Sequence, residues 1–449
     1  MTVVARSLGI ATSNSAGTGI AQATIANVNG GISLTRFTTG SVAYGGYTWT
    51  LTPAHPGDTV VLWGTGGGAD PANDAGGTSG DQTQAGNFSV VVNGSPITPL
   101  YSGASSGYPG LWQVNFTLPT DITPDCFTSV QVKGGGVLSN AISIPIAANG
   151  QTACSDPQLN AAALARLDAG GTVVGGGFGM ARGTNTFSYI ATPGAATTVT
   201  SASQEQVSGV FSVYNASEYA AIFSGIKIGP CILNDRTAPA TARNPADPDG
   251  YLNAGAALPF AGPGVAAGAA LSVYSTNPGP LYNLGLANGT IVNGGQYTLT
   301  GNGGTGVGPF SVSVNFPPSF TVTDWDSLNT IDRSRPLVLN WTGGTDQVLV
   351  IGSTSKVVGK DASNTNIIRN VSFTCQVPAA AGSITIPTDL LSYLLPEGID
   401  AASLATGSGQ LAVETSTSQP FTATLPGGGQ FAWAGLTATL GYSKNLAVQ

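Results

Sequence analysis

The chain has 449 residues, enough for two to four domains, because a single core rarely grows much beyond ~250 residues. Charged residues make up only 8% of it, against a typical ~25%, so Ser, Thr, Asn, Gln and Gly must supply most of the polar surface. With 14 Lys plus Arg and a net charge of −8, the sequence offers no basic stripe for phosphates, which argues against nucleic acid and anionic membranes as partners. No apolar run reaches ~18 residues, so we expect no membrane span.

The first element is a short β-prone run at residues 2–10, which a turn-rich segment separates from the next strand. One alternative is a strand folded onto its own domain, since unpaired edges are a liability. A second is the last strand of an upstream domain, and a third is a free strand that adds to the sheet of a neighbouring molecule. In that hypothesis the assembly strand carries the apolar residues Val3, Val4, Ala5, Leu8 and Ile10. The N-terminus lacks a signal-peptide pattern, so export would need a signal outside this numbering.

From residue 17 onward, short alternating strands are punctuated by Gly and Asn turns. Apolar side chains at Trp112, Val114 and Phe116 alternate with polar ones, which predicts a strand with one buried face. Asn93-Gly94 is typical of a tight hairpin, because both residues tolerate positive φ. About seven strands at this spacing predict a β-sandwich.

Three segments carry a family resemblance: HPGDTVVLWGTGGG at 55–68, YSGASSGYPGLWQVNFTLP at 101–119 and GGGVLSNAISIPIA at 134–147. They resemble the uncharacterised acidobacterial (Solibacter-type) C-terminal domain, an immunoglobulin-like module of secreted proteins. A second block, with a string at 333–344 that ends W-T-G-G, resembles a part often found in the same proteins. The resemblance implies an immunoglobulin-like fold and an extracellular location, and it implies no reaction.

Two helices interrupt the β pattern. In the first, Ser155 or Asp156 caps a helix that begins at Pro157, and in the second Thr388 caps a short helix that Pro396 stops. The fold class is therefore all-β, with tandem immunoglobulin-like β-sandwich domains and two short helices. The predicted domains, with Pro317-Pro318 as the clearest boundary, are an N-terminal arm at 1–16, the sandwich at 17–150, a second β domain at 151–318 and a third at 319–449.

Four cysteines without CxxC spacing, in a chain with one histidine, favour disulfides in an oxidising compartment over a zinc site. Four cysteines allow three pairings. Cys126 opens a strand of the hairpin that ends before Cys154, so we favour that pair. Cys231 and Cys375 then form a long-range link.

Catalytic patterns are scarce. His55 is the only histidine, and no G-x-S-x-G string accompanies it, so we expect no enzyme. Calcium is the least implausible ion, because two glycine-flexible loops supply hard oxygen ligands, although neither matches a known calcium motif. The candidate ligands are Asp70, Asn73, Asp74 and Asp81 in one loop and Asp247 and Asp249 in the other.

These features favour a bacterial extracellular structural protein, a subunit of a cell-surface filament, sheath or layer that self-associates into a homopolymer by strand addition. The alternative is a secreted adhesin or carbohydrate-binding module that binds a glycan through its loops. We expect no cofactor, and calcium is the one ion for which these loops offer ligands.

Overall fold

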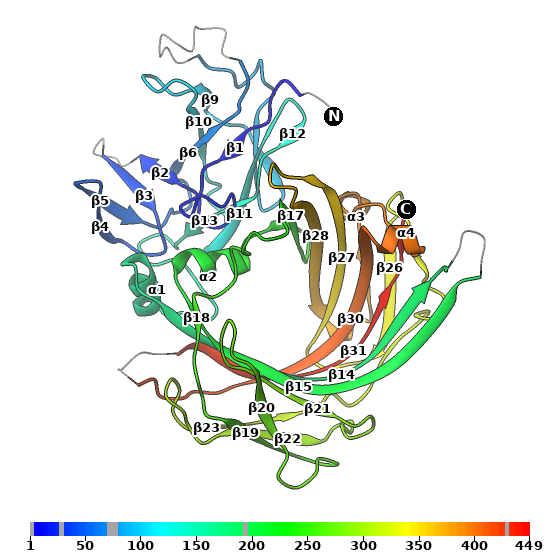
Figure 1. Cartoon of the computed structure of the whole chain (residues 1–449). Helices are drawn as coiled ribbons and strands as arrows, with labels where there is room; N and C mark the ends of the chain where they lie inside the picture. The colour runs from blue at the N-terminus through cyan, green and yellow to red at the C-terminus, as the bar shows by residue number, and fades with distance from the viewer. Residues whose placement is uncertain (1–3, 27–30, 70–79, 192–195, 427–430) are drawn as a thin grey trace. The chain divides into compact units, whose positions relative to one another are not determined.

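The structure, a computed structural model, describes residues 4–26, 31–69, 80–191, 196–426 and 431–449 (Figure 1). Strands make up 53% of the chain and helices 6%, which confirms an all-β protein with a few short helices. Among the helices in these ranges, none is long and apolar enough to cross a membrane.

The chain divides into two compact units that are interleaved in sequence. Unit 1 comprises Met1–Val173, Tyr214–Gly229 and Asn244–Asp249, and unit 2 comprises Val174–Val213, Pro230–Arg243 and Gly250–Gln449. The units follow contacts in space, whereas the predicted domains are continuous stretches of sequence. The predicted boundaries at 150 and 318 therefore stay predictions.

Unit 1 contains two β-sheets that share one hydrophobic core. The first sheet has the order β4-β5-β3-β2-β6-β10-β9, with β1 on β6, and the second has the order β12-β11-β7-β8, with β13 on β11. The bounds of the strands are β1 Gly9–Ile10, β2 Ala23–Ala26, β3 Ile32–Thr35, β4 Gly40–Tyr44, β5 Tyr47–Thr52, β6 Thr59–Thr65, β7 Ser89–Val92, β8 Ser95–Ile97, β9 Tyr101–Ala104, β10 Trp112–Thr117, β11 Asp125–Gly134, β12 Val137–Leu138 and β13 Ile142–Ile146. A short strand, β16 (Ile226–Ile228), also belongs to this unit.

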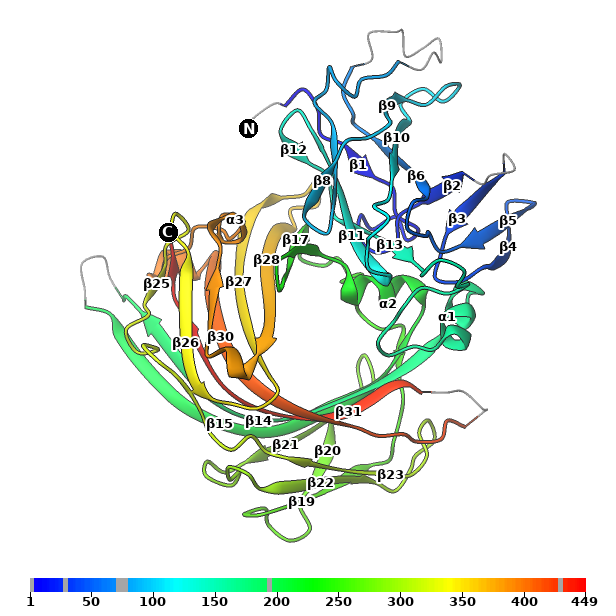
Figure 2. The ribbon, with the colours of Figure 1, turned by 180° about the vertical axis from the view of Figure 1, so that it is seen from behind.

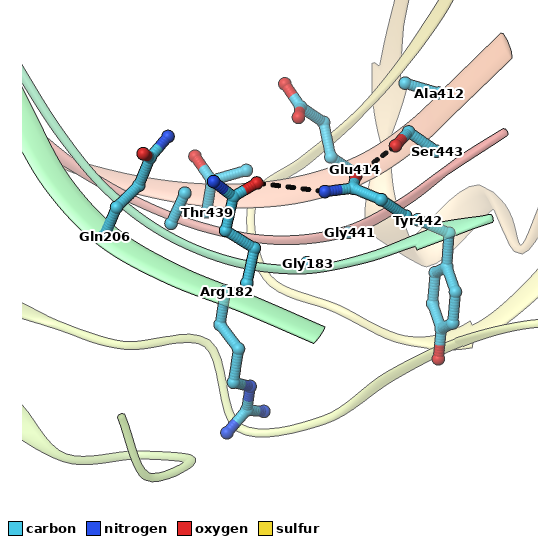
Figure 3. A pocket seen from close by; sticks show the side chains of 12 residues that line it. Arg182, Gly183, Gln206, Ala412, Glu414, Thr439, Gly441, Tyr442 and Ser443 are labelled. Carbon is cyan, nitrogen blue, oxygen red and sulfur yellow. Dashed lines mark hydrogen bonds between the residues drawn. The ribbon is translucent and has the colours of Figure 1, made fainter. Parts of the chain in front are cut away.

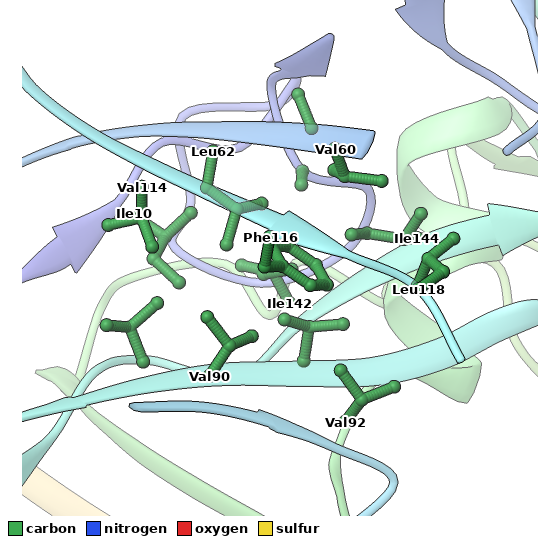
Figure 4. Close-up of a cluster of buried hydrophobic side chains, with 14 of the residues drawn as sticks. Ile10, Val60, Leu62, Val90, Val92, Val114, Phe116, Leu118, Ile142 and Ile144 are labelled. Carbon is green, nitrogen blue, oxygen red and sulfur yellow. The ribbon is translucent and has the colours of Figure 1, made fainter. Parts of the chain in front are cut away.

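Alternate residues of these strands fill the core between the sheets (Figure 4). In β10, Trp112, Val114 and Phe116 are buried and the residues between them are partly exposed, as the alternation predicts. Burial of each such side chain stabilises the fold by about 1.5–3 kcal/mol. The hairpin predicted at Asn93-Gly94 is confirmed, since it joins β7 to β8 with φ of 46° and 83°.

The N-terminal strand β1 is paired within its own unit. On one edge it pairs with β6, where Ile10 lies opposite Gly64. On the other edge, the Ile10 N–H donates to Oδ1 of Asn140 at 2.7 Å, and Nδ2 of Asn140 donates to the Ile10 carbonyl at 3.0 Å. Leu8 and Ile10 are buried in the shared core.

The glycines of the W-G-T-G-G-G segment allow this close approach. A Cβ atom on Gly64 would lie 2.3 Å from the Gly9 carbonyl oxygen, and one on Gly66 would lie 2.4 Å from the Ser7 carbonyl oxygen. Real Cβ atoms do not approach backbone oxygens this closely. The glycine run therefore serves the packing of β1.

Helix α1 (Ala161–Asp168) lies in unit 1 and begins later than predicted. Its cap is Asn160, whose side chain accepts from the Ala163 N–H, so the predicted cap at Ser155 or Asp156 is wrong. The reason is local: the carboxylate of Asp156 accepts from the N–H groups of Gln158 and Leu159 at 2.8 and 2.9 Å and closes a separate turn.

Helix α2 (Ala216–Phe223), also in unit 1, is not one of the two helices predicted from the sequence. It starts with a capping box in which Asn215 and Glu218 satisfy each other's backbone N–H groups. The hydroxyl of Tyr219 donates to Asp156 at 2.9–3.0 Å. The N-x-x-E spacing at 215–218 was the available sequence signal.

Unit 2 is organised around one extended sheet with the order β17-β28-β27-β30-β31-β14-β15-β21-β20-β19-β22-β23. Strand β18 pairs with β15, and two small sheets, β24-β26-β29 and β25-β32, complete the unit. The bounds are β14 Val173–Tyr189, β15 Thr198–Tyr214, β17 Cys231–Pro239, β18 Gly250–Tyr251, β19 Ala257–Ala261, β20 Ala270–Ser275, β21 Leu281–Leu286, β22 Gln296–Gly301, β23 Phe310–Asn315, β24 Phe320–Val322, β25 Thr330–Ile331, β26 Leu337–Gly343, β27 Gln347–Lys360, β28 Asn366–Pro378, β29 Ser383–Ile386, β30 Gly407–Pro420, β31 Phe431–Asn445 and β32 Ala447–Val448.

The middle strands of this sheet are long and bent (Figures 1 and 2). Strands β14 and β15 have 17 residues each, and β31 has 15. Strand β31 lies between β30, its antiparallel neighbour, and β14, with which it runs parallel. This parallel pairing brings residues 258 positions apart into contact, as for Asn185 and Ser443.

Two short helices and a 3-10 turn, η2 (Ala379–Ala381), lie in the last third of unit 2. Helix α3 (Thr388–Leu391) lies where the second helix was predicted, but Thr388 is its first residue and the cap position is Pro387, which has no side-chain donor or acceptor. Helix α4 (Ala401–Leu404) was not predicted, and the Asp400 side chain caps it.

Candidate functional site

The four central strands of unit 2, β30, β31, β14 and β15, have one buried face and one accessible face. The buried face consists of apolar side chains from alternate positions: Phe178, Met180, Val207, Leu411, Val413, Leu436, Ala438 and Leu440. The positions between them form what we call the open face: Gly179, Ala181, Gly183, Asn185, Phe187, Gln204, Gln206, Ser208, Gln410, Ala412, Glu414, Ser416, Thr437, Thr439, Gly441 and Ser443. Small residues, amides and hydroxyls dominate this second set.

A recess of about 170 Å³ lies on the open face (Figure 3). Gly183 and Gly441 are opposite each other in the parallel β14–β31 pair, and Gly441 is also opposite Glu414 in the β30–β31 pair. A Cβ atom on Gly441 would lie 2.6 Å from the Cβ of Glu414, so glycine is required there to leave room for this side chain. At Gly183 an added Cβ would meet only the Gly441 carbonyl oxygen, at 3.5 Å.

Polar side chains border the recess in a hydrogen-bonded row. The Ser443 hydroxyl donates to Oδ1 of Asn185, and Nδ2 of Asn185 donates to Oε1 of Gln204 at 3.0 Å. These three residues come from β31, β14 and β15, so the row crosses the strands. It fixes the orientation of the Asn185 amide.

Glu414 is the one charged side chain on the open face of these four strands, as far as the structure describes them. It points to the concave side of the bent strands in Figure 3, whereas Arg182 and Tyr442 point to the other side. Arg182 there donates to the Ile291 carbonyl at 2.6 Å, and the Tyr442 hydroxyl donates to the Phe320 carbonyl at 3.1 Å. Burial raises the pKa of Glu414 above its ordinary value.

An aromatic pair continues the open face along β14. Phe187 is 49% exposed, and its ring stacks on that of Tyr189 with centroids 6.4 Å apart at 26°. The backbone between the two rings is held by buried Asn445, which accepts from the Ser188 N–H at 2.6 Å and donates to its carbonyl at 2.7 Å. The Phe187 ring is therefore exposed, the Tyr189 ring is half-buried, and the backbone between them is held in place.

The residues predicted as an assembly strand lie elsewhere, in unit 1. Val3 lies outside the described residues, and Val4 and Ala5 are exposed. Leu8 and Ile10 are buried, and β1 pairs with β6, so this part of the segment is a strand folded onto its own domain. That is the first of the three alternatives that the sequence left open.

The calcium candidates are only partly described, because Asp70, Asn73 and Asp74 lie outside the described residues. Asp81 accepts from the Thr83 N–H at 2.9 Å. Asp247 accepts from the Asn244 N–H at 3.0 Å, and Asp249 accepts from Nδ2 of Asn215 at 2.8 Å. Within the described ranges, no group of three or more His, Cys, Asp or Glu residues is placed to hold a metal ion. Calcium binding stays a prediction.

The disulfides join Cys126 to Cys154 and Cys231 to Cys375, the pairing favoured from the sequence. Cys231 and Cys375 lie directly opposite each other in the β17–β28 pair. None of the sequence-predicted residues lies on the open face. The signal that was available is the alternation in Q-L-A-V-E-T-S-T-S at 410–418, where every second residue is apolar up to Val413 and the others are small or polar.

Comparisons with known proteins add little. No family model and no curated protein matches the chain. Among solved structures, the chain is similar to SGBP-B of the Bacteroides ovatus mixed-linkage glucan utilization locus, determined in complex with a mixed-linkage heptasaccharide. The identity is 12%, the TM-score is 0.15, and the match covers 79% of this chain and 67% of that one. A likeness this weak carries no argument about function, and the acidobacterial resemblance stays a prediction.

Proposed function

We propose that the protein is an extracytoplasmic binding protein that recognises a polysaccharide on the open face of unit 2. The observation that carries the proposal is the composition of that face, where amides and hydroxyls surround a recess and the exposed Phe187 ring, stacked on Tyr189, lies further along β14. The two disulfides are consistent with an extracytoplasmic, β-rich protein.

The chemistry of sugars matches this face in two ways. Sugar hydroxyls both donate and accept hydrogen bonds, as do the side chains of Asn, Gln, Ser and Thr. Sugar rings also have apolar C–H surfaces, for which an exposed aromatic ring such as Phe187 is a rigid partner. A face with few charges also lowers the desolvation penalty when a neutral ligand binds.

The structural-subunit function predicted from the sequence rested on a free strand at residues 2–10. In the structure, β1 pairs with β6, and Asn140 occupies the other edge at Ile10. In the described residues, no contact favours strand donation over polysaccharide binding. Polysaccharide binding is therefore the function that we test first.

Affinity gel electrophoresis with xylan, galactomannan, dextran and hydroxyethyl cellulose tests the proposal. We expect at least one neutral polymer to retard the protein, and Phe187→Ala to weaken that binding about tenfold, which corresponds to ~1.4 kcal/mol. Val199→Ala is the matched control, because Val199 is 56% exposed on β15 but lies outside the open face. Absence of retardation by every polymer, or equal losses in both variants, would refute the proposal.

A further inference from the structure

The charged side chains on the buried side of the four central strands already have partners. Glu205 accepts from the N–H groups of Gly289 and Ile291 at 2.8 and 2.7 Å and so fixes that loop. Lys444 donates to the Leu328 carbonyl at 2.8 Å. These groups are used by the fold, whereas Glu414 is on the accessible side.

The carboxylate of Glu414 has no hydrogen bond or ion pair with any described residue. Desolvation by its surroundings is the single cause of its raised pKa, which agrees with this lack of partners. A carboxylate has about four lone-pair positions for donors. In this recess the donors must come from solvent or from a ligand.

The recess also provides space for a ligand group beside this carboxylate. Gly183 and Gly441 remove two side chains from adjacent strands, and the hydrogen-bonded row of Ser443, Asn185 and Gln204 borders the gap. The fixed Asn185 amide and the Glu414 carboxylate thus line the same recess. A sugar ring that enters it meets an acceptor with a full negative charge.

We infer that Glu414 is a specificity-determining residue, which accepts hydrogen bonds from ligand hydroxyls and makes the open face select neutral polysaccharides over acidic ones. This inference rests on the proposed polysaccharide binding. Hydrogen bonds to a charged acceptor are roughly twice as strong as neutral ones, so hydroxyls gain from the carboxylate. A carboxylate or sulfate on the ligand would instead place a like charge beside it, which is how binding sites reject wrong partners.

The test compares hydroxyethyl cellulose with carboxymethyl cellulose, and dextran with carboxymethyl dextran, at ~0.15 M salt, where charges more than ~8 Å apart are screened. We expect the wild-type protein to bind the neutral member at least tenfold more tightly. Glu414→Gln keeps the shape of the side chain and should reduce this preference at least tenfold. Asp326→Asn, which removes one exposed negative charge outside the open face, should leave it unchanged.

A second pair of variants tests the recess itself. Gly183→Val should fill the recess and weaken neutral binding at least tenfold, whereas Gly179→Val, on the same face but outside the recess lining, should leave binding within threefold. Melting temperatures check that both variants fold. If neutral polymers bind but Glu414→Gln leaves the preference unchanged, the inference is wrong and the proposed function stands. If no polymer binds the wild-type protein or any variant, the proposed function itself is wrong.

Discussion

Individual glycines in the two units have different roles. In the W-G-T-G-G-G run of unit 1, a Cβ on Gly64 would lie 2.3 Å from a backbone oxygen, and one on Gly67 would lie 2.1 Å from the Trp112 ring. In β14 of unit 2, a Cβ on Gly175 would lie 2.3 Å from the Trp433 ring, whereas one on Gly177 or Gly179 would meet nothing within 4 Å. In the first unit the missing side chain lets the chain close on itself. In the second, Gly177 and Gly179 leave two positions of an open strand without side chains.

The largest expected difference between the two regions is in how much the truncation of a side chain lowers the free energy of unfolding. Phe116 is fully buried in the core of unit 1, so Phe116→Ala should lower the free energy of unfolding by about 3–5 kcal/mol. Thr439→Ala, on the open face, should change it by less than ~0.5 kcal/mol. Urea denaturation of both variants measures this. Similar losses would mean that the open face is covered in solution.

Glycine replacement gives the next largest effect. Gly64→Ala should displace β1 and expose Leu8 and Ile10, with a loss of about 2–4 kcal/mol and faster amide exchange at residues 7–11. Gly9→Ala, on the facing strand, is the matched control, because a Cβ there meets nothing within 4 Å. If the control is as destabilised as Gly64→Ala, the close approach of β1 is not the cause.

The pH dependence of the free energy of unfolding should show the contribution of Asp168, the buried carboxylate of unit 1. Asp168 accepts from the Thr38 N–H at 2.7 Å and from its hydroxyl at 2.9 Å, and burial raises its pKa to about 6. Because the folded pKa lies above the ordinary one, the protonated form favours folding. The contribution is therefore largest below about pH 4 and is lost as pH rises through 6, by at most ~3 kcal/mol. Asp168→Asn should flatten this slope in pH-dependent urea denaturation, and an unchanged slope would assign it to another group.

The smallest effect is expected from the carboxylate of unit 2. Burial raises the pKa of Glu414 too, so its charged form slightly opposes folding near neutral pH. Glu414 is partly exposed, and Glu414→Gln should therefore raise the free energy of unfolding by less than ~1 kcal/mol at pH 7 and leave it unchanged at pH 4. Calorimetric melting at both pH values measures the difference. A clear loss of stability would mean that Glu414 supports the fold.

Local patterns in the sequence were sufficient to predict several strands and turns of unit 1. Alternation predicted the buried side of β10, and Asn93-Gly94 predicted its hairpin, because both depend on neighbours within a few residues. The predicted start of the first helix was wrong because another local interaction competes with capping. Asp156 closes a turn of its own before α1. Capping residues compete over short distances, and the sequence does not show which one prevails.

The open face could not be predicted from the sequence, for a different physical reason. Period-two alternation shows that Gln410, Ala412 and Glu414 share one side of a strand, but it does not show whether another layer covers that side. The recess also depends on Gly183 and Gly441 meeting across a parallel pair far apart in sequence. The same limit applies to β1, whose three alternatives differed only in the sheet with which the strand pairs.

The position of β31 between β30 and β14 has a consequence for the order of events during synthesis. Strand β14 leaves the ribosome more than two hundred residues before its parallel neighbour and must wait with one long edge unpaired. Closing so large a loop is slow, and unpaired edges of nascent chains invite aggregation. The long edge of β14 is therefore covered only once the C-terminal strand β31 has been made.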